Sequence, residues 1–319
     1  MNHTISVAPM LDWTDKHCRY LHRLLSPDAV LYTEMVTTPA ILQGDTQKYI
    51  GFNPQEQPVI LQLGGSEPSQ LAKSCKIAQD FGYDGINLNV GCPSDRVQKG
   101  RFGACLMHEP QLVADCINAM QNAVTLPISI KCRIGVDDND SYENFQNFIA
   151  TVIASGTHSI IVHARKAWLK GLSPKQNRSV PPLNYDYVYK IKQQFPDTQF
   201  ILNGGIQKST AIEAHLKHLD GVMLGRAIWN NPWLLNELHN DFYPEKFITT
   251  RDEVLLKYQD YCQQQIKKGV KLHWLLPPIL NLYHGKIGNK KWKNHLVTQA
   301  PLRANDITIF EQAREFIHE

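Results

Sequence analysis

Three side chains at the end of one short apolar run have the chemistry of a functional site. In the stretch Gly85-Ile-Asn-Leu-Asn-Val-Gly-Cys-Pro93, Asn87 and Asn89 alternate with apolar residues, and Cys92 follows on a turn between Gly and Pro. The alternation is typical of a β-strand with two different faces, so both amides point the same way. Because a buried amide without hydrogen bonds costs about 1–3 kcal/mol, we expect a polar ligand on that side.

Cys92 stands apart from the other cysteines. The chain has seven, the others being Cys18, Cys75, Cys105, Cys116, Cys132 and Cys262. There is no Cys-x-x-Cys pair and no even count of the kind a disulfide framework needs, and we interpret the other six as small buried hydrophobes.

No regular pattern follows Cys92 before about His108, and so long a loop in a compact chain is typical of a functional segment. No Asp, His and Glu cluster has metal-ligand spacing, so no metal is expected.

Eight short apolar segments, most followed by a helical pattern, would position these groups. They begin near Ser6, Val30, Val59, Gly85, Ile128, Ser159, Phe200 and Gly221. Strands that alternate with helices over about 225 residues predict a (β/α)8 barrel, also called a TIM barrel, with an open doubly wound sheet as the alternative.

Two of the connecting helices are predicted in detail. The first begins at Pro68, ends at Gly82 and has an inward stripe of Leu71, Cys75, Ala78 and Phe81. The second begins at Pro110, with Leu112, Cys116, Ala119 and Met120 inward.

In such a barrel the active site lies at the carboxyl ends of the strands. Nearly every predicted strand ends in a polar or glycine-rich group: Ala8-Pro-Met10, Thr33-Glu34, Gln62-Leu-Gly-Gly65, Asn89 to Cys92, Lys131-Cys-Arg133, His163-Ala-Arg165, Asn203-Gly-Gly205 and Gly225-Arg226. The last two follow strands seven and eight, where glycine backbone and Arg226 suit a phosphate. Lys131 and His163 are expected to face the same cofactor-sized space.

The loop after His163 is long and basic. It carries Arg165, Lys166, Lys170, Lys175, Arg178 and Trp168, with no acidic residue before Asp186. Five positive charges and an aromatic ring on the rim of the site suit a substrate with a phosphate backbone and stackable bases.

Positive charge is concentrated in one segment near the C-terminus. The net charge is +3, but no acidic residue occurs from Tyr261 to Asn305, while eight basic residues do. A basic C-terminal module on an acidic body suggests a polyanionic partner, although a solvated lysine-rich helix face would have the same composition.

The module is predicted from apolar spacing. Residues 241–250 are expected to form a linker, and residues 251–319 a helical domain. Its predicted apolar faces are Val254, Leu255, Tyr258 and Tyr261, and Ile309, Phe310, Ala313 and Phe316. The segment Lys290-Lys-Trp-Lys-Asn-His295, with Trp292 inside it, is the expected second contact for an anionic substrate.

The order of these motifs resembles the tRNA-dihydrouridine synthase family from about residue 5 to residue 235. The matching blocks are Ala8-Pro-Met10, Tyr32-Thr-Glu-Met35, Gln62-Leu-Gly-Gly65, Asn87-Leu-Asn-Val-Gly-Cys-Pro-Ser94, Lys131-Cys-Arg-Ile-Gly135, His163-Ala-Arg165, Asn203-Gly-Gly-Ile206 and Gly221-Val-Met-Leu-Gly-Arg226. Residues 7–15 and 163–174 are more narrowly similar to its A-type subfamily, whose targets are uridines 20 and 20a of the tRNA D-loop.

The resemblance implies an FMN-binding barrel at 1–240 and a helical tRNA-binding domain at 241–319, with NADPH as reductant and NADH as the alternative. The residues it implies for FMN are Pro9, Met10, Leu11, Gln62, Lys131, His163, Asn203, Gly204, Gly205, Gly225 and Arg226. Cys92 is the implied proton donor, and Asn89, Lys175 and Arg178 are the implied tRNA contacts.

The residue chemistry agrees with this role. Reducing the C5–C6 bond of uracil takes a hydride to C6, which reduced flavin supplies, and a proton to C5 from a positioned acid. An ordinary thiol, with a pKa of about 8.5, carries that proton at neutral pH. Lys131 would stabilise negative charge on the reduced flavin or the uracil enolate. The target base must leave its stack to reach such a site.

One segment departs from the family pattern. Related enzymes carry a basic residue and a Leu-Gly-Leu-Phe run where this chain has Leu276-Pro-Pro-Ile-Leu-Asn-Leu-Tyr283, and Pro277 offers no charge to a phosphate. The hypothesis is that Lys286, Lys290 and Lys291 compensate.

Two other functions stay open at this point. A flavin barrel acting on a small molecule, such as a dihydroorotate-type oxidoreductase, explains the phosphate site but not the basic module. A catalytically idle RNA-binding barrel explains the charge but makes Cys92, Lys131 and His163 a coincidence. The chain shows no signal peptide and no apolar run near ~18 residues, so we expect a cytoplasmic protein without a membrane partner. We also expect it to be a monomer.

Overall fold

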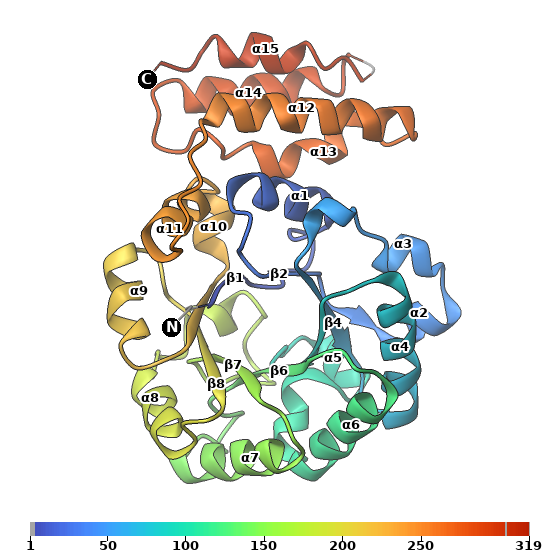
Figure 1. Ribbon diagram of the computed structural model, residues 1–319, viewed down its shortest axis with the longest axis vertical. Helices are drawn as coiled ribbons and strands as arrows, with labels where there is room; N and C mark the ends of the chain where they lie inside the picture. Colours follow the sequence, from blue (N-terminus) through green and yellow to red (C-terminus); the bar gives the residue numbers. More distant parts are fainter. Residues whose placement is uncertain (1–3, 304, 319) are drawn as a thin grey trace.

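The computed structural model describes residues 4–303 and 305–318, so the outermost residues of the two predicted domains, 1–3 and 319, lie outside the described part. Within it, parallel strands form one sheet in the order β1-β9-β8-β7-β6-β5-β4-β2. A parallel bridge between Ser6 and Val30 brings the two ends together. The predicted barrel is confirmed and the open doubly wound sheet is wrong (Figure 1).

All eight predicted strands are present. They are β1 (Thr4–Val7), β2 (Leu31–Tyr32), β4 (Val59–Gly64), β5 (Gly85–Val90), β6 (Ile128–Arg133), β7 (Ser159–His163), β8 (Gln199–Asn203) and β9 (Gly221–Leu224). A further strand, β3 (Val36–Thr37), pairs with the end of β4 and was not predicted, because two residues carry no periodic signal.

Helices surround the barrel. They are α1 (Lys16–Leu25), α2 (Thr38–Gln43), α3 (Thr46–Ile50), α4 (Pro68–Phe81), α5 (Asp95–Lys99), α6 (Pro110–Ala123), α7 (Tyr142–Ala154), α8 (Tyr185–Gln194), α9 (Ser209–Leu216), α10 (Arg226–Asn230) and α11 (Leu234–Phe242). Short 3-10 turns occur at η1 (Pro54–Glu56), η2 (Gly103–His108) and η3 (Gln176–Arg178).

The two helices predicted in detail differ in accuracy. In α4 the expected stripe is buried except for the half-buried Phe81, and Gly82 ends the helix with a φ of 87°. In α6 the start and two inward residues are correct, but Leu112 and Ala119 are only half-buried. Val113 and Ile117 are buried in their place, so the true inward face is rotated slightly around the helix axis.

The segment after β5 is more regular than predicted. The expectation of an irregular stretch from Val90 to His108 is wrong, because α5 and η2 lie within it. Both elements are too short, at five and six residues, to show a helical period in the sequence. Cys92 therefore lies on a structured segment.

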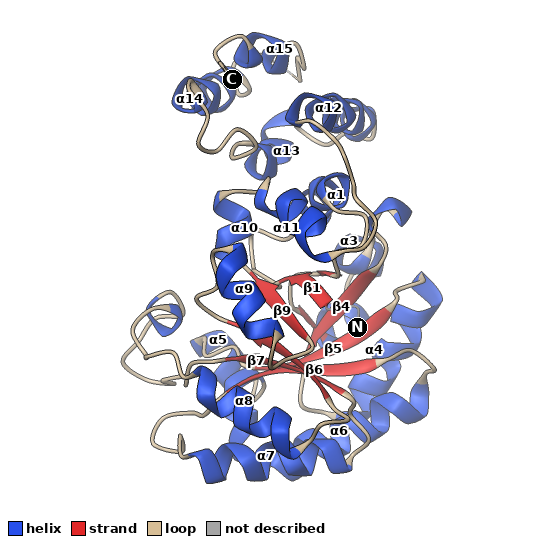
Figure 2. Ribbon diagram, turned by 60° about the vertical axis from the view of Figure 1, so that its left-hand side comes forward, coloured by secondary structure: helices blue, strands red, loops and turns tan. Residues whose placement is uncertain are grey.

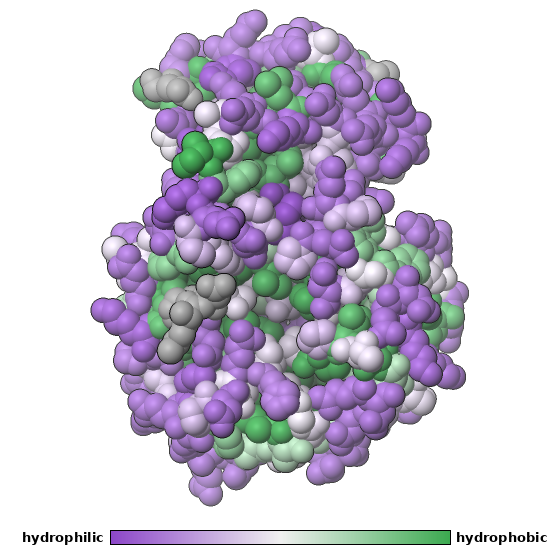
Figure 3. Space-filling view, viewed as in Figure 1, coloured by the Kyte–Doolittle hydropathy of each residue, from purple (hydrophilic) through white to green (hydrophobic). Residues whose placement is uncertain are grey.

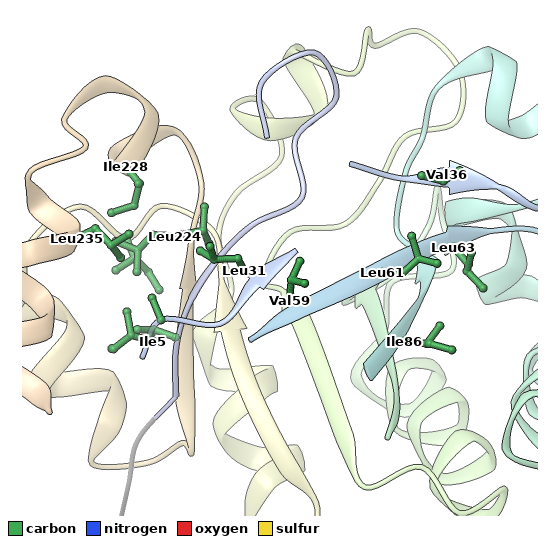
Figure 4. Close-up of a cluster of buried hydrophobic side chains, with 14 of the residues drawn as sticks. Ile5, Leu31, Val36, Val59, Leu61, Leu63, Ile86, Leu224, Ile228 and Leu235 are labelled. Carbon is green, nitrogen blue, oxygen red and sulfur yellow. The ribbon is translucent and has the colours of Figure 1, made fainter. Parts of the chain in front are cut away.

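The barrel wall separates two apolar layers. On the outside, Ile5 of β1 and Leu224 of β9 lie close to Ile228 of α10 and Leu235 of α11 (Figure 4). On the inside, a smaller cluster comprises Ala8, Tyr32, Ile161, Ile201 and Met223. Strands covered on both faces hold the polar groups at their ends on a rigid frame.

The C-terminal region is helical, as predicted. Its helices are α12 (Arg251–Lys267), α13 (Leu272–Ile279), α14 (Asn289–Gln299) and α15 (Ile309–Arg314), which cluster beside α1 (Figures 1 and 2). Tyr261 of α12 stacks on Tyr20 of α1 at 3.9 Å between ring centroids, and its hydroxyl lies 2.6 Å from His17 Nδ1. The cluster is thus tied to the barrel through a buried aromatic contact. Hydrophilic side chains cover most of its viewed face (Figure 3).

Candidate active site

A chain of buried amides crosses the inside of the barrel. Gln62 Nε2 donates to Asn87 Oδ1, and Asn89 Nδ2 donates to Gln62 Oε1, both at 2.8 Å. Asn87 Nδ2 donates to Ser129 Oγ at 2.9 Å. The prediction that Asn87 and Asn89 share one face is confirmed. The expectation that they wait for a ligand is wrong for Asn87, because neighbouring strands supply its partners.

Asn89 also builds the turn that holds Cys92. Its Oδ1 accepts the backbone N–H groups of Gly91 at 3.1 Å and Cys92 at 3.0 Å. The Cys92 carbonyl accepts the N–H of Ala104 at 2.9 Å. The thiol is half-buried and lies 3.6 Å from Ser94 Oγ. Its backbone is thus fixed from two sides.

Lys131 and Asn203 meet at the mouth of the barrel. Lys131 Nζ donates to Asn203 Oδ1 at 3.0 Å, and Asn203 Nδ2 donates to the Met223 carbonyl at 2.8 Å. Burial, assisted by the nearby Arg133 guanidinium, lowers the pKa of Lys131 to about 8. The lysine stays mainly protonated at neutral pH but can lose its proton just above it.

His163 lies beside them, because β6 and β7 pair in parallel with Arg133 opposite His163. Burial of the ring and the positive charges of Arg133 and Lys131 hold the pKa of His163 well below its ordinary value. The imidazole is therefore neutral and offers one N–H donor.

Glycines open space at the ends of β8 and β9. Gly204 and Gly205 have φ values of 113° and 73°. A Cβ on Gly204 would lie 2.7 Å from Cδ2 of the His163 ring, and one on Gly225 would lie 3.1 Å from Met10 Sδ. No larger residue fits at Gly204 without displacing the histidine.

Three arginines meet beside this glycine cradle. Burial and then the charge of Arg226 lower the pKa values of both Arg165 and Arg178. Arg226 Nη2 donates to the Arg178 carbonyl at 2.9 Å, and Arg165 Nε is buried without a hydrogen-bond partner. Among the described residues none of the three forms an ion pair with a carboxylate. Bare glycine backbone and unpaired guanidinium groups fit a cofactor that carries a phosphate.

A family model described as Dihydrouridine synthase (Dus) matches residues 6–315. The chain belongs to the dihydrouridine synthase family. The tRNA-dihydrouridine(20/20a) synthase of Xanthomonas campestris pv. campestris is 52% identical over 313 residues, which cover 98% of this chain and 92% of that relative. The tRNA-dihydrouridine(20/20a) synthase of Vibrio cholerae serotype O1 is 49% identical over 311 residues, covering 97% and 95%.

Solved structures extend the comparison of the fold. A structure of morphinone reductase in complex with tetrahydroNAD superposes with a TM-score of 0.53 and 11% identity, over 76% of this chain and 88% of that one. At this identity the likeness concerns the barrel alone.

Arg133 lies in the candidate site, although no role was assigned to it from the sequence. It is only 3% exposed, and its Nε donates to the Gly91 carbonyl at 2.9 Å. Its Nη1 donates to the carbonyls of Lys166 and Asn177, each at 3.0 Å. The two-residue period of a strand could have indicated this position, because Arg133 follows Lys131 by two positions and its side chain points to the same face. Burial lowers its pKa to about 10, so it keeps its charge at neutral pH.

The charged side chains of the basic loop after β7 differ in their exposure to solvent. Lys166 is half-buried, forms an ion pair with Asp140 at 2.7 Å and lies 4.1 Å from the ring centroid of Trp168. Arg165 turns inward and donates to the Pro181 carbonyl. The charges left on the surface are those of Lys170, Lys175 and Arg178.

The remaining predicted residues lie in different surroundings. Gln62 is 1% exposed inside the barrel, and Met10 packs against the inner apolar cluster. Leu11 is instead 65% exposed, on the turn that Asp12 completes at a φ of 65°. The Asp12 N–H donates a hydrogen bond to the Glu34 carboxylate, and this bond anchors the turn.

The C-terminal basic segment differs from its prediction at one residue. Lys290 and Lys291 are exposed, but Trp292 is fully buried and its Nε1 donates to the Leu280 carbonyl at 3.1 Å. Trp292 therefore belongs to the apolar core of the helical cluster, and the contact of the basic segment with an anionic substrate stays a prediction for its exposed lysines. Pro277 is exposed on α13.

Among residues 4–303 and 305–318, no group of His, Cys, Asp or Glu side chains could hold a metal ion. No helix in that part of the chain is long and apolar enough to cross a membrane.

Proposed function

We propose that this protein reduces uridines in the tRNA D-loop, at positions 20 and 20a, to 5,6-dihydrouridine. The observation that carries the proposal is the convergence of the Cys92 thiol, protonated Lys131, neutral His163 and a carboxylate-free arginine cluster at the mouth of one barrel. Family membership and the printed names of the relatives support the same activity.

The cofactor we propose is FMN. The residues that would hold it are Pro9, Met10, Leu11, Gln62, Lys131, His163, Asn203, Gly204, Gly205, Gly225 and Arg226. When bound and reduced by NADPH or NADH, FMN would supply the hydride for C6 of the uracil ring. The glycine cradle and Arg226 would receive its phosphate, and neutral His163 would donate one hydrogen bond.

The acid is Cys92. The thiol would transfer its proton to C5 as the C5–C6 double bond is reduced, leaving a thiolate that solvent reprotonates. Lys131, charged below pH about 8, would stabilise negative charge as it develops on the uracil oxygen. Asn89 holds the backbone of Cys92 so that the thiol meets the base from a fixed direction.

The substrate contacts would extend outward from this centre. Asn89 lines the base pocket, and Lys175 and Arg178 face the phosphates, while Lys286, Lys290 and Lys291 contact tRNA away from the barrel. In this proposal residues 1–240 are the catalytic domain and 241–319 the tRNA-binding domain. The protein acts as a cytoplasmic monomer.

Nucleoside mass spectrometry tests the function directly. An unmodified tRNA transcript is incubated with protein, FMN and NADPH, beside Cys92→Ala. We expect a uridine heavier by two hydrogens, mapped by fragments to positions 20 and 20a, and its loss in the variant. Bound, reducible flavin with no reduced uridine, even on tRNA from cells lacking only this modification, would instead favour a small-molecule substrate.

A further inference from the structure

One glutamine joins the segment of Cys92 to the basic loop. Gln98 lies on α5, and its Nε2 donates to the Pro93 carbonyl at 2.9 Å and to the Leu169 carbonyl at 2.8 Å. Both N–H groups of a single amide are therefore used. One bond reaches the residue next to Cys92, and the other reaches a residue 71 positions away in the loop after β7.

On the Cys92 side, α5 and the turn form a single unit. The Gln98 N–H donates to the Ser94 carbonyl at 2.9 Å. Val97 is buried against Gly103, where a Cβ would lie 2.4 Å from Val97 Cγ1 and 2.6 Å from the Cys92 carbonyl oxygen. With so little free space, a shift of α5 would also shift the backbone of Cys92.

On the other side, the basic loop is built around a buried amide. Asn177 is fully buried, accepts the Trp168 N–H at 2.8 Å and donates to the Trp168 and Leu172 carbonyls at 2.9 and 3.1 Å. Leu169, to which Gln98 is bonded, lies within this framework. Lys175 and Arg178 project from the same loop on either side of Asn177, so a phosphate that moves them displaces a packed unit.

We propose that Gln98 is a positioning residue that couples the binding of tRNA phosphates on the basic loop to the placement of the Cys92 thiol. Arg133 makes a second bridge between the same two segments, through the Gly91 and Lys166 carbonyls. Gln98 differs because it is half-buried and uncharged, so it can be replaced without burying an unpaired charge. The inference rests on the proposed function and adds communication between its two parts.

The test uses Gln98→Leu, which removes both bonds at similar size, and Gln98→Glu, which stays polar but cannot donate. Lys99→Leu, exposed on the same helix, is the control. With FMN-loaded protein and saturating tRNA, we expect the single-turnover rate to fall about tenfold in both Gln98 variants and to stay unchanged in the control. The tRNA Kd should change less than about twofold.

A double-mutant cycle separates coupling from simple support. Lys175→Ala should lower the saturating rate about threefold in the wild-type background and have no further effect in Gln98→Leu. Rate losses that multiply, or a full rate in Gln98→Glu, would overturn the proposal.

A readout without tRNA distinguishes this failure from failure of the function. Iodoacetamide alkylation of Cys92, followed by peptide mass spectrometry to separate it from the half-buried Cys105, should change more than about threefold in Gln98→Leu relative to Lys99→Leu. An unchanged alkylation rate would overturn the positioning role, whereas wild-type protein that makes no dihydrouridine would overturn the function alone.

Discussion

The barrel mouth and the C-terminal helical cluster both carry positive charge, but the charged groups are bonded within the structure at the mouth and exposed to solvent in the cluster. At the mouth, Lys131 and Arg133 are bonded to backbone and amide oxygens on rigid strands, and burial changes their pKa values. In the cluster, Lys290 and Lys291 lie exposed on α14. We therefore expect the buried charge to act in the chemical step, since screening there is weak, and the exposed charge to act in a salt-sensitive encounter.

The largest effect should come from the acid itself. Cys92→Ala removes the proposed proton donor, and general acid catalysis typically contributes about 10²–10⁴-fold, so we expect the rate of uridine reduction to fall by that factor. Flavin absorbance and tRNA affinity should be unchanged, because the Asn89 contacts to the turn use backbone N–H groups. Single-turnover mass spectrometry measures the rate. Retention of most activity would remove Cys92 from the reaction.

The second prediction contrasts two tryptophans by stability. Trp292 is fully buried and packs against Tyr283 at 5.0 Å and Phe310 at 6.4 Å between ring centroids, so Trp292→Ala should lower the free energy of unfolding by about 3–5 kcal/mol. Trp168 is half-buried, and Trp168→Ala should cost clearly less. Urea denaturation followed by circular dichroism measures both. Equal losses would contradict the distinction between core and rim.

The position of Trp292 was readable from the sequence. Trp292, Leu296 and Ala300 follow one another at intervals of four, which places them on one helix face, and all three are buried. The segment was interpreted from the charge of the lysines around Trp292, and this four-residue period was not considered.

The strands were predictable because their signal is local. Apolar runs bounded by glycine, proline and polar residues carry it over a few positions, and all eight predicted strands exist. Arg133 and Gln98 were not assigned roles because the partners of Arg133, and the Leu169 carbonyl to which Gln98 donates, lie 33 to 71 residues away along the chain. Only the closed barrel brings those carbonyls within reach of one side chain.

The third prediction concerns pH. The pKa of Lys131 is lowered from its ordinary value to about 8, so the ammonium is present below that pH and is lost above it. We expect the saturating rate of uridine reduction to fall as pH rises through about 8, by a factor on the order of ten between pH 7 and pH 9.5. In Lys131→Arg, if it still binds flavin, the fall over that range should be smaller than in the wild type, because the arginine keeps its charge while an ordinary thiol donor still loses its proton there. A wild-type rate that stays flat to pH 9.5 would show that the charge on Lys131 is not required.

The fourth prediction should have the smallest effect on the chemical step. Replacing Lys286, Lys290 and Lys291 with glutamine removes charge without touching the barrel mouth, so the saturating rate should change less than about twofold. The tRNA affinity should fall, and the slope of log K against log salt should become shallower by up to about 3, because each lost phosphate contact releases roughly one counterion fewer.

The matched control for this variant replaces Lys73, Lys76 and Lys217, which are exposed on the outer helices of the barrel or just after them. It has the same net charge as the triple variant, so a general loss of attraction for tRNA would affect both equally. A loss confined to the first variant assigns the contact to the C-terminal cluster. Equal losses, or none, would mean that this cluster does not compensate for Pro277, and that the loop bearing Lys175 and Arg178 attracts tRNA alone.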